Sequence, residues 1–303
     1  METFKALIFI LVRHLTGLSL IFTSPFALAA SPGVSFSVIK TAQSSGSLEA
    51  MVVSGGRLLE PRYLVHNAVL IRHPEGDILW DTGIGRQIEM QVKAFGFLDR
   101  QLFKVEGVDP ARDQLERHHY NFNALKAIIP SHMHWDHVSG LEDFVDIPVW
   151  TPKISHSEAK EGEAPAFIEA QYDAPELRWK YIDLTAQAYL GFSRSLDIYG
   201  DGRLVLVDLS GHTNGHLGLF VNLEDGSRYF FIGDTTWVLE GIQSRKSRPV
   251  FVNWLVGVDT NVDENFNRIE EIYQLSQRNP EIIIVPTHDE KVLKTLPLYP
   301  EFR

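Results

Sequence analysis

Short apolar runs that end in polar loops recur along this chain and dominate its hydrophobic pattern. Runs of this length, bounded by glycine, proline or acidic residues, predict buried or half-buried strands. The strands expected on this basis span residues 34–42, 64–72, 77–81, 125–130, 147–151, 204–209, 217–221, 229–232 and 282–285. Turn residues at 74–76 and 224–226 indicate two β-hairpins. The chain is therefore expected to carry sheet in both halves.

Two segments show helical character instead. Residues 261–277 place apolar side chains at helical spacing, and Pro280 ends the pattern. Residues 155–171 are rich in Glu and Ala and predict a second helix. A short helix is also expected directly after Ser139, whose hydroxyl is placed to cap it. The stretch 85–123 carries no motif, and its apolar residues either pack in the core or form a wall beside a site.

Composition narrows the classes of function. The chain has 303 residues, 44% of them apolar, which is enough for a substantial core. A net charge of -11 disfavours a nucleic-acid partner, because phosphate backbones are bound by basic surfaces. The lack of cysteine excludes disulfides and thiolate ligands, so any metal must be held by nitrogen and oxygen. We expect one domain over residues 31–303 that acts on a small molecule; the sequence indicates no oligomeric state.

Residues 1–30 have the features of a signal peptide. A mostly apolar run over 15–23 is followed by small residues at 27–29, which provide a cleavage site. Arg13 and His14 interrupt the apolar stretch, and this argues against a stable membrane span. We expect the signal to be cleaved and the protein to be exported, to the periplasm or the medium; an uncleaved anchor is the alternative.

The most informative polar loop follows the strand at 125–130. It holds three histidines and one aspartate in close succession, namely His132, His134, Asp136 and His137. Imidazole and carboxylate groups are ligands of borderline divalent metals such as zinc. A His-x-His pair alone is a weak signal, but an Asp and a further His at the next spacings make a chance match rare. The loop therefore predicts a metal site at a strand end.

Three more polar residues follow later strands: His212, Asp234 and His288. Each alone would be an ordinary polar residue at a strand end, but their order after the central cluster favours a shared site. The expected ligand sets are His132, His134 and His212 for one ion, Asp136, His137 and His288 for a second, and Asp234 between them. Two divalent ions, preferably zinc, would share a water molecule and convert it to a hydroxide nucleophile.

These motifs together resemble the metallo-β-lactamase-fold hydrolase superfamily. The residues that carry the resemblance are Asp81-Thr82-Gly83, His132-x-His134-x-Asp136-His137, Gly211-His212-Thr213-x-Gly215-His216, Gly233-Asp234 and Pro286-x-His288. The resemblance extends over residues 35–290 and implies an α+β fold, the four-layer αβ/βα sandwich of two mixed β-sheets with helices outside. It also implies two metals at one edge, held by the same seven ligands.

Within the superfamily the layout is similar to the N-acyl homoserine lactonase branch. Those lactonases carry a tyrosine three residues after the bridging aspartate, where this chain has Trp237. An indole can donate a hydrogen bond but cannot transfer a proton. Ser210 also replaces the proline common before Gly-His-Thr. The resemblance implies metal-dependent hydrolysis of a small ester, lactone or amide; a lactonase for N-acyl homoserine lactones and a non-catalytic metal-binding protein are the alternatives.

Roles for the remaining polar residues follow from their positions. Asp136 is expected to be catalytic, orienting the water or passing its proton to the leaving group. Asp81 is either a turn residue or a support for a ligand, and His216 is structural or a similar support. The other histidines match no motif and are expected on the surface or in the core: His66, His73, His118, His119 and His156. Pocket walls are expected from residues 85–110 and 153–195.

Overall fold

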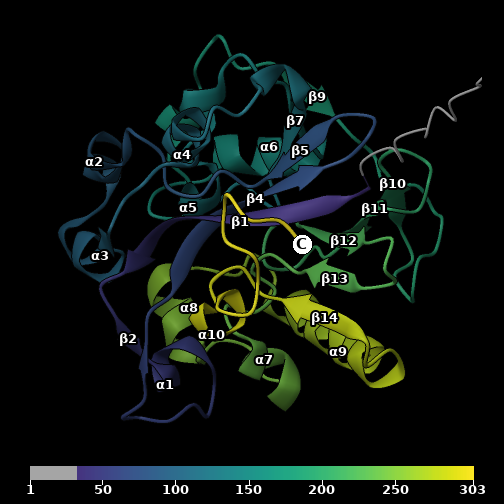
Figure 1. The fold of residues 1–303 in the computed structure, drawn as a ribbon. Helices are drawn as coiled ribbons and strands as arrows, with labels where there is room; N and C mark the ends of the chain where they lie inside the picture. Colours follow the sequence, from purple (N-terminus) through teal and green to yellow (C-terminus); the bar gives the residue numbers. More distant parts are fainter. Residues whose placement is uncertain (1–32) are drawn as a thin grey trace, which may run out of the picture. The chain divides into compact units, whose positions relative to one another are not determined.

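The computed structural model describes residues 33–303, which belong to the compact unit Pro32–Arg303. The expected signal peptide, and the export inferred from it, lie outside the described residues. Within the described part of the chain, no helix is both long and apolar enough to cross a lipid bilayer. Two larger sheets form the framework of this unit (Figure 1).

The larger sheet comes from the first part of the chain. Its strands lie in the order β6 (Val105–Glu106), β1 (Ser35–Ser44), β4 (Val65–Arg72), β5 (Asp77–Trp80), β7 (Leu125–Ile129), β8 (Val149–Thr151) and β9 (Trp179–Tyr181). β4 and β5 form the predicted antiparallel hairpin, whereas β5, β7, β8 and β9 are parallel neighbours. Since β5 and β7 are parallel, the loops that follow them leave the same edge of the sheet.

The second sheet comes from the later part of the chain. Its strands lie in the order β10 (Ser195–Asp197), β11 (Leu204–Asp208), β12 (Leu217–Asn222), β13 (Arg228–Phe231) and β14 (Ile282–Val285). The hairpin predicted around 224–226 is confirmed as β12–β13, and β14 adds parallel to β13. β2 (Ser47–Leu48) and β3 (Pro61–Arg62) form a separate two-stranded sheet.

The helices connect and cover these sheets. The α-helices are α1 (Glu49–Val52), α2 (Ile88–Gln91), α3 (Phe97–Leu102), α4 (Ala111–Arg117), α5 (Trp135–Val138), α6 (Lys153–Glu161), α7 (Leu239–Ser244), α8 (Val250–Val256), α9 (Val262–Arg278) and α10 (Glu290–Leu293). The 3-10 helices are η1 (Val92–Ala94), η2 (Phe122–Ala124), η3 (Leu141–Phe144) and η4 (Glu169–Gln171). The predicted helix at 261–277 is confirmed as α9, and the Asn261 side chain caps it by accepting from Glu264 N–H at 3.1 Å.

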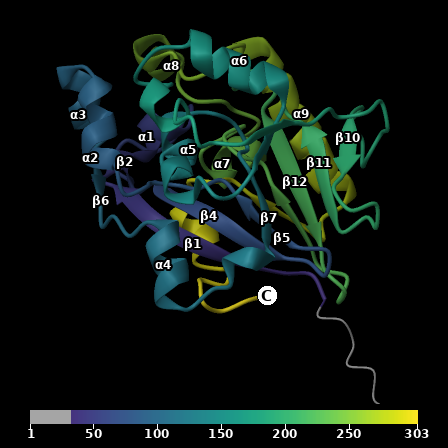
Figure 2. The ribbon, with the colours of Figure 1, turned by 90° about the horizontal axis from the view of Figure 1, so that it is seen from above.

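Three apolar clusters set the layers. One cluster joins Phe36 and Trp80 of the larger sheet to Leu219 and Phe231 of the second, so the sheets pack face to face. Another packs the outer face of the larger sheet against α4 and α6, and a third packs β11–β14 against α7 and α9. Helices α4 and α9 accordingly lie on opposite sides of the sheets (Figure 1 and Figure 2). Each fully buried Leu, Ile or Phe contributes about 1.5–3 kcal/mol to this sandwich.

Two helix predictions are wrong in detail. Residues 155–171 do not form one helix, because α6 ends at Gly162, whose backbone is extended, and η4 begins only later. The Ser139 hydroxyl caps no helix. Its hydroxyl accepts from Gly85 N–H at 3.0 Å and donates to Gln91 Oε1 at 2.6 Å, so it joins two loops instead.

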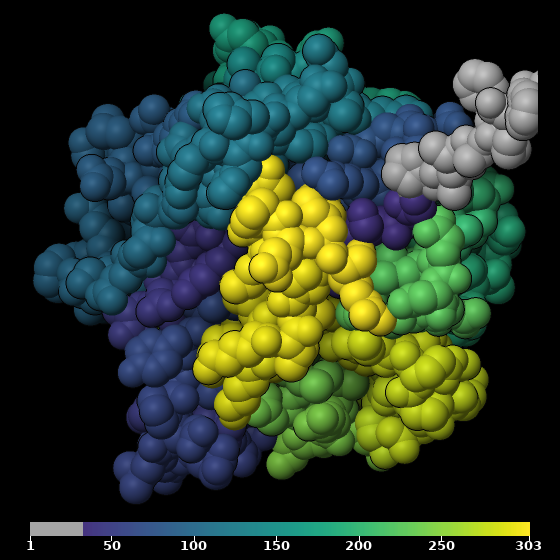
Figure 3. All heavy atoms as spheres, viewed as in Figure 1, coloured from purple at the N-terminus to yellow at the C-terminus, as the bar shows by residue number. Residues whose placement is uncertain are grey.

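The C-terminal residues lie along β1. Val38 N–H donates to Pro297 O at 2.9 Å, and Phe36 and Arg303 exchange two backbone hydrogen bonds of 3.0 Å. In Figure 3 this segment (yellow) crosses the surface beside the N-terminal strands (purple). Because β14 precedes residue 288 and α10 follows it, the loop that carries His288 is held at both ends.

Candidate metal centre

The polar loops after the strands meet at one edge of the two sheets. Leu217 N–H, at the start of β12, donates to Ser131 O at 2.8 Å and so connects the loop after β7 to the second sheet. Thr287 N–H donates to Gly233 O at 3.2 Å and connects the loops after β14 and β13. Carboxyl ends of neighbouring parallel strands share an edge, which is why loops far apart in sequence converge here.

All seven predicted ligands come together at this edge. They fall into three groups, two of which share His132, and within each group one ligand atom of each residue lies within 4.8 Å of the others. The groups are His132, His134 and His212; His132, His137 and Asp234; and His66, Asp136 and His288. The structure therefore gathers every candidate that the motifs indicated and adds one residue, His66, that they did not.

The first group consists of neutral imidazoles. His132 Nε2 and His212 Nε2 are 3.2 Å apart. His212 Nδ1 lies 2.8 Å from a carboxylate oxygen of Asp259, which can only accept, so its Nδ1 carries the proton and its Nε2 keeps a lone pair. Burial lowers the pKa of His132 and His212 well below the ordinary value and that of His134 to about 4. At neutral pH these rings are uncharged and available as ligands.

Asp234 lies between the two halves of the cluster. Its Oδ1 is 3.3 Å from His137 Nε2, and its Oδ2 is 3.0 Å from His288 Nε2 and 3.8 Å from His212 Nε2. Asp136 Oδ2 approaches the same His288 nitrogen at 3.4 Å. Burial raises the pKa of Asp234, but the facing imidazoles of His288 and His137 outweigh it and hold that pKa well below its usual range. A buried anion thus faces both groups of histidines.

The protonation pattern calls for a cation here. His288 Nδ1 donates to Val65 O at 2.7 Å, and His137 Nδ1 faces Asp81 Oδ2 at 2.9 Å, so both Nδ1 atoms carry protons and the Nε2 atom of each ring faces Asp234. Burial opposes a charge on His137, yet the surrounding carboxylates raise its pKa well above the ordinary value. His137 Nε2 and Asp234 Oδ1 are buried without a hydrogen-bond partner. Divalent metal ions fit these donor atoms in number, type and protonation.

Two predicted supports are in place beside the ligands. Asp81 has a left-handed backbone (φ 57°) and accepts from Ser131 N–H at 2.6 Å as well as facing His137, so it orients that ring. His216 donates to Leu209 O at 3.1 Å and accepts from Asp234 N–H at 3.2 Å. The hydrogen bond at the second ring nitrogen fixes the orientation of a metal-ligating histidine, and Asp81 makes that bond here.

A further support, the ion pair of Arg248 and Asp259, was not predicted. Arg248 Nη1 lies 2.7 Å from Asp259 Oδ1, the carboxylate that holds His212, and Arg248 Nη2 donates to the carbonyl oxygen of Asp234. Its guanidinium also lies over the Trp237 ring, 4.8 Å from the centroid. Arg248 and Asp259 belong to no motif, and they become neighbours of the ligands only through the tertiary fold.

His66 matched no motif and was expected only on the surface or in the core, but it lies among the candidate ligands. His66 is buried, and its Nδ1 is 3.1 Å from Asp136 Oδ2. One signal in the sequence could have located it: β4 runs antiparallel to β5, so the start of β4 lies at the edge where β5 delivers Asp81. The other unassigned histidines do lie elsewhere; His73, for example, stacks on Tyr199.

Trp237 occupies the position where lactonases have tyrosine. Its Nε1–H donates to Asp234 Oδ2 at 3.0 Å. The indole proton, which the sequence left free to hold a developing oxyanion, is thus engaged with the carboxylate between the two ligand groups.

A cavity of about 240 Å³ opens over the cluster. His66, Asp136, Trp237 and His288 line its polar end, and its apolar wall includes Leu102, Phe103, Val252 and Leu255. The expected contribution of residues 85–110 is confirmed for 101–104. Residues 153–195 contribute only Pro165 and Ala166, to a small adjoining hollow. Their expected place is taken by residues 44–52 and by α8.

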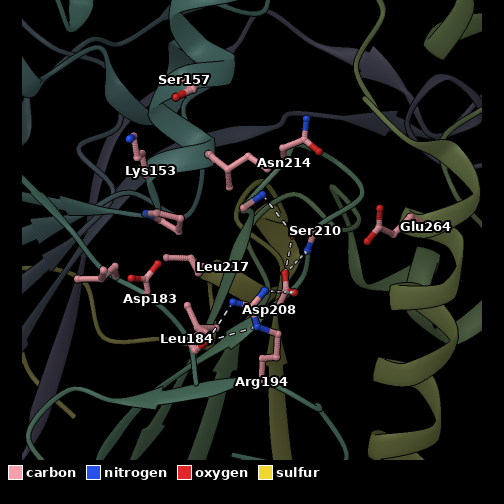
Figure 4. A pocket seen from close by; sticks show the side chains of 14 residues that line it. Lys153, Ser157, Asp183, Leu184, Arg194, Asp208, Ser210, Asn214, Leu217 and Glu264 are labelled. Atoms are coloured by element: carbon pink, nitrogen blue, oxygen red, sulfur yellow. Dashed lines mark hydrogen bonds and ion pairs between the residues drawn. The ribbon is translucent and has the colours of Figure 1, made fainter. Parts of the chain in front are cut away.

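A larger cavity, of about 650 Å³, lies elsewhere and is lined by part of 153–195. Figure 4 shows its lining, which includes Lys153, Asp183, Arg194 and Glu264. None of the seven ligand candidates lines it. Size alone therefore does not identify the reactive site, which is marked by converging polar groups instead.

The sandwich and the histidine-rich edge define a class of metal-binding proteins with the metallo-β-lactamase fold. The chain belongs to the metallo-beta-lactamase superfamily, whose profile matches residues 61–288. This confirms the family that the motifs indicated.

Relatives of known name are hydrolases, and a hydrolase class fits this chain. The N-acyl homoserine lactonase AttM of Rhizobium radiobacter is 23% identical over 241 residues, 77% of this chain and 85% of that protein. The probable metallo-hydrolase Rv2300c of Mycobacterium tuberculosis is 26% identical over 247 residues, 75% of each chain. A solved structure of a Bacillus thuringiensis AiiA mutant with N-decanoyl-L-homoserine bound has a TM-score of 0.67 at 20% identity and covers 89% of this chain and 98% of that one. The predicted fold is thereby confirmed.

Proposed function

We propose that this protein is a dinuclear metal-dependent hydrolase that cleaves a small ester, lactone or amide. The observation that carries the proposal is the pair of imidazole-rich ligand groups on either side of the Asp234 carboxylate, next to a cavity with apolar walls. Each group alone resembles half of a metal site, and Asp234 reaches both.

The residues divide between two ions, which we propose to be zinc. His132, His134 and His212 would hold the first, Asp136, His137 and His288 the second, and Asp234 both. When bound, two such ions lower the pKa of a water molecule between them and polarise the substrate carbonyl. An all nitrogen and oxygen donor set also suits iron, manganese and cobalt, so metal analysis belongs in the test.

Asp136 is the proposed catalytic residue. It lies at the polar end of the cavity, and although burial opposes ionisation, the imidazoles of His137 and His66 keep its pKa below the ordinary value. An ionised carboxylate there can orient a water molecule, accept its proton and pass the proton to the leaving group. Trp237 holds Asp234 through its indole N–H and lines the cavity next to Asp136 and His288.

The cavity favours a substrate with an apolar tail. Leu102 and Phe103 on one side and Val252 and Leu255 on the other present hydrocarbon within reach of the ligand cluster. An N-acyl homoserine lactone has this chemistry, and relatives with that activity support it as the alternative, more specific function. Trp237 in place of the lactonase tyrosine weighs against simple transfer of that activity.

Hydrolysis by the purified protein tests the proposal. Chromogenic acyl esters, acyl lactones and cephalosporins would be assayed with metal content measured on the same sample. We expect two equivalents of metal, turnover of at least one ester or lactone, and loss of turnover on chelation with recovery on adding Zn²⁺. Two bound equivalents without turnover of any substrate would favour a metal-binding protein without catalysis.

Export remains a separate proposal that depends on residues 1–30 alone. Expression of the full chain in a bacterium should yield a mature protein, in the periplasm or the medium, whose N-terminus lies near residue 31. Recovery of the intact N-terminus from the membrane fraction would indicate an anchor instead.

A further inference from the structure

We propose that His66 is a positioning residue of the second metal site, where its Nδ1–H holds the carboxylate of Asp136 in place. This role lies outside the seven-ligand pattern and goes beyond the proposed function, on which it depends.

The geometry at Asp136 is the first support. His66 Nδ1 lies 3.1 Å from Asp136 Oδ2, and since a carboxylate only accepts, the proton is on Nδ1. Among residues 33–303, this is the only hydrogen bond to the Asp136 side chain that the structure contains. Asp136 is a short side chain on α5, so one well-placed donor decides which way its oxygens face.

The local backbone aims His66 at this position. β1 bulges opposite His66, where the register shifts between Lys40 and Ala42, and bulges near active sites commonly re-aim a side chain. Thr41, the bulged residue, donates its hydroxyl to His66 O at 3.0 Å and accepts from Ile84 N–H at 2.9 Å. The backbone of His66 is therefore fixed from the neighbouring strand.

The His66 ring also packs against two other rings. Its centroid lies 5.8 Å from that of Trp135 and 5.2 Å from that of His288. A buried ring in contact with a tryptophan and a ligand candidate has little rotational freedom. It can present Nδ1 to Asp136 without losing much conformational entropy when a metal binds.

The other ligands show the same arrangement. Asp81 holds His137 at 2.9 Å, Asp259 holds His212 at 2.8 Å, and the Val65 carbonyl holds His288 at 2.7 Å. Removal of such outer partners typically weakens metal binding about 10–100-fold. His66 gives Asp136 the corresponding partner, with the donor and acceptor roles exchanged.

The test measures binding of Zn²⁺ and Co²⁺ by the purified protein, by competition with a chelating indicator, and does not depend on any substrate. We expect His66→Ala to lower the affinity for the second metal equivalent by about 10–100-fold and to leave the affinity for the first unchanged. His66→Asn, whose amide N–H can replace Nδ1–H, should recover affinity to within a few-fold of the wild type. His73→Asn is the matched control, because His73 is also a buried histidine but stacks on Tyr199 away from the cluster.

The outcomes separate this role from others. If the wild type and His66→Ala bind both metal equivalents with the same affinities, the role of His66 is overturned while the dinuclear site stands. If His66→Asn binds as weakly as His66→Ala and the Co²⁺ absorption spectrum changes in both, His66 is a direct ligand and the positioning role is wrong. A wild type that binds a single equivalent would refute the dinuclear function and this proposal with it.

Discussion

Replacement of Arg248 by methionine would leave the buried carboxylate of Asp259, which faces His212 Nδ1, without its cationic partner. Methionine keeps an unbranched apolar chain over the Trp237 ring but removes the guanidinium that lies 2.7 Å from Asp259 Oδ1. Asp259 then remains a buried carboxylate whose short-range partners are both neutral, the His212 ring at 2.8 Å and the Asn265 amide at 3.4 Å. The substitution should therefore destabilise the native state.

The magnitude follows from the burial of the pair. The side chains of Arg248 and Asp259 are 1% and 2% exposed, so solvent does not screen the charge that is left. Removal of one member of a buried ion pair costs about 3–5 kcal/mol. With a urea m-value of about 3 kcal/mol per M, the unfolding midpoint should fall by roughly 1–1.7 M.

Urea unfolding followed by circular dichroism, at one fixed Zn²⁺ concentration, measures this change. Arg117→Met is the matched control: Arg117 pairs with Asp109 at 2.6 Å but is 55% exposed, so its loss should cost under about 1 kcal/mol. In the double variant Arg248→Met/Asp259→Asn no charge is left unpaired. The loss in its free energy of unfolding should therefore be smaller than the sum of the two single losses by about 2 kcal/mol or more. A midpoint within about 0.3 M of wild type, or simple additivity, would refute the reasoning.

Three further predictions concern the site and the pH dependence. Asp136→Asn should lower kcat by about 10²–10⁴-fold with only a modest loss of metal, and unchanged turnover in steady-state assays would count against Asp136 as the proton carrier. Trp237→Phe removes the 3.0 Å hydrogen bond to Asp234 and should weaken metal binding about tenfold in chelator competition; equal affinity would show that this bond is dispensable. Burial raises the pKa of Asp143 from 3.8 to about 6 against the opposing Arg86 N–H, so the native state binds this proton more tightly than the unfolded chain. Stability from this group is present below pH 3.8 and is lost as pH rises through 6, and Asp143→Asn should flatten that decline in midpoints measured from pH 4 to 7.

The local pattern of apolar and polar residues was sufficient to predict most of the strands and the long helix α9. The strands that became β4, β5, β12, β13 and β14 were predictable because their side chains alternate or run apolar between turn residues. α9 was predictable because its apolar residues repeat at helical spacing and Asn261 caps it. Both features act within a few residues, so they can be read without knowing what packs against them.

The ligand set was predictable for a related reason. The seven candidate ligands follow strand ends, and parallel strands bring their ends to a common edge. The prediction of one helix over 155–171 was wrong because Gly162 ends α6. The prediction that Ser139 caps a helix was wrong because its hydroxyl bonds to Gly85 and Gln91, which are distant in sequence.

The supporting residues depend on contacts between distant segments. His66 meets Asp136 across 70 positions, and Arg248 reaches Asp234 from a loop that carries no motif. The wall of the cavity likewise comes from α8 and residues 44–52, neither of which carries a motif. Periodicity does not encode such pairings, because they arise when separate elements pack.

The chain alone thus determined which side chains could bind metal and which strands deliver them, since strand pattern and motif spacing are local properties. Only the tertiary structure decided which protons those side chains carry, which partners hold them and what shape of substrate can approach. Hydrogen bonds and burial across the two sheets set those properties, and they exist only once the sheets are packed together.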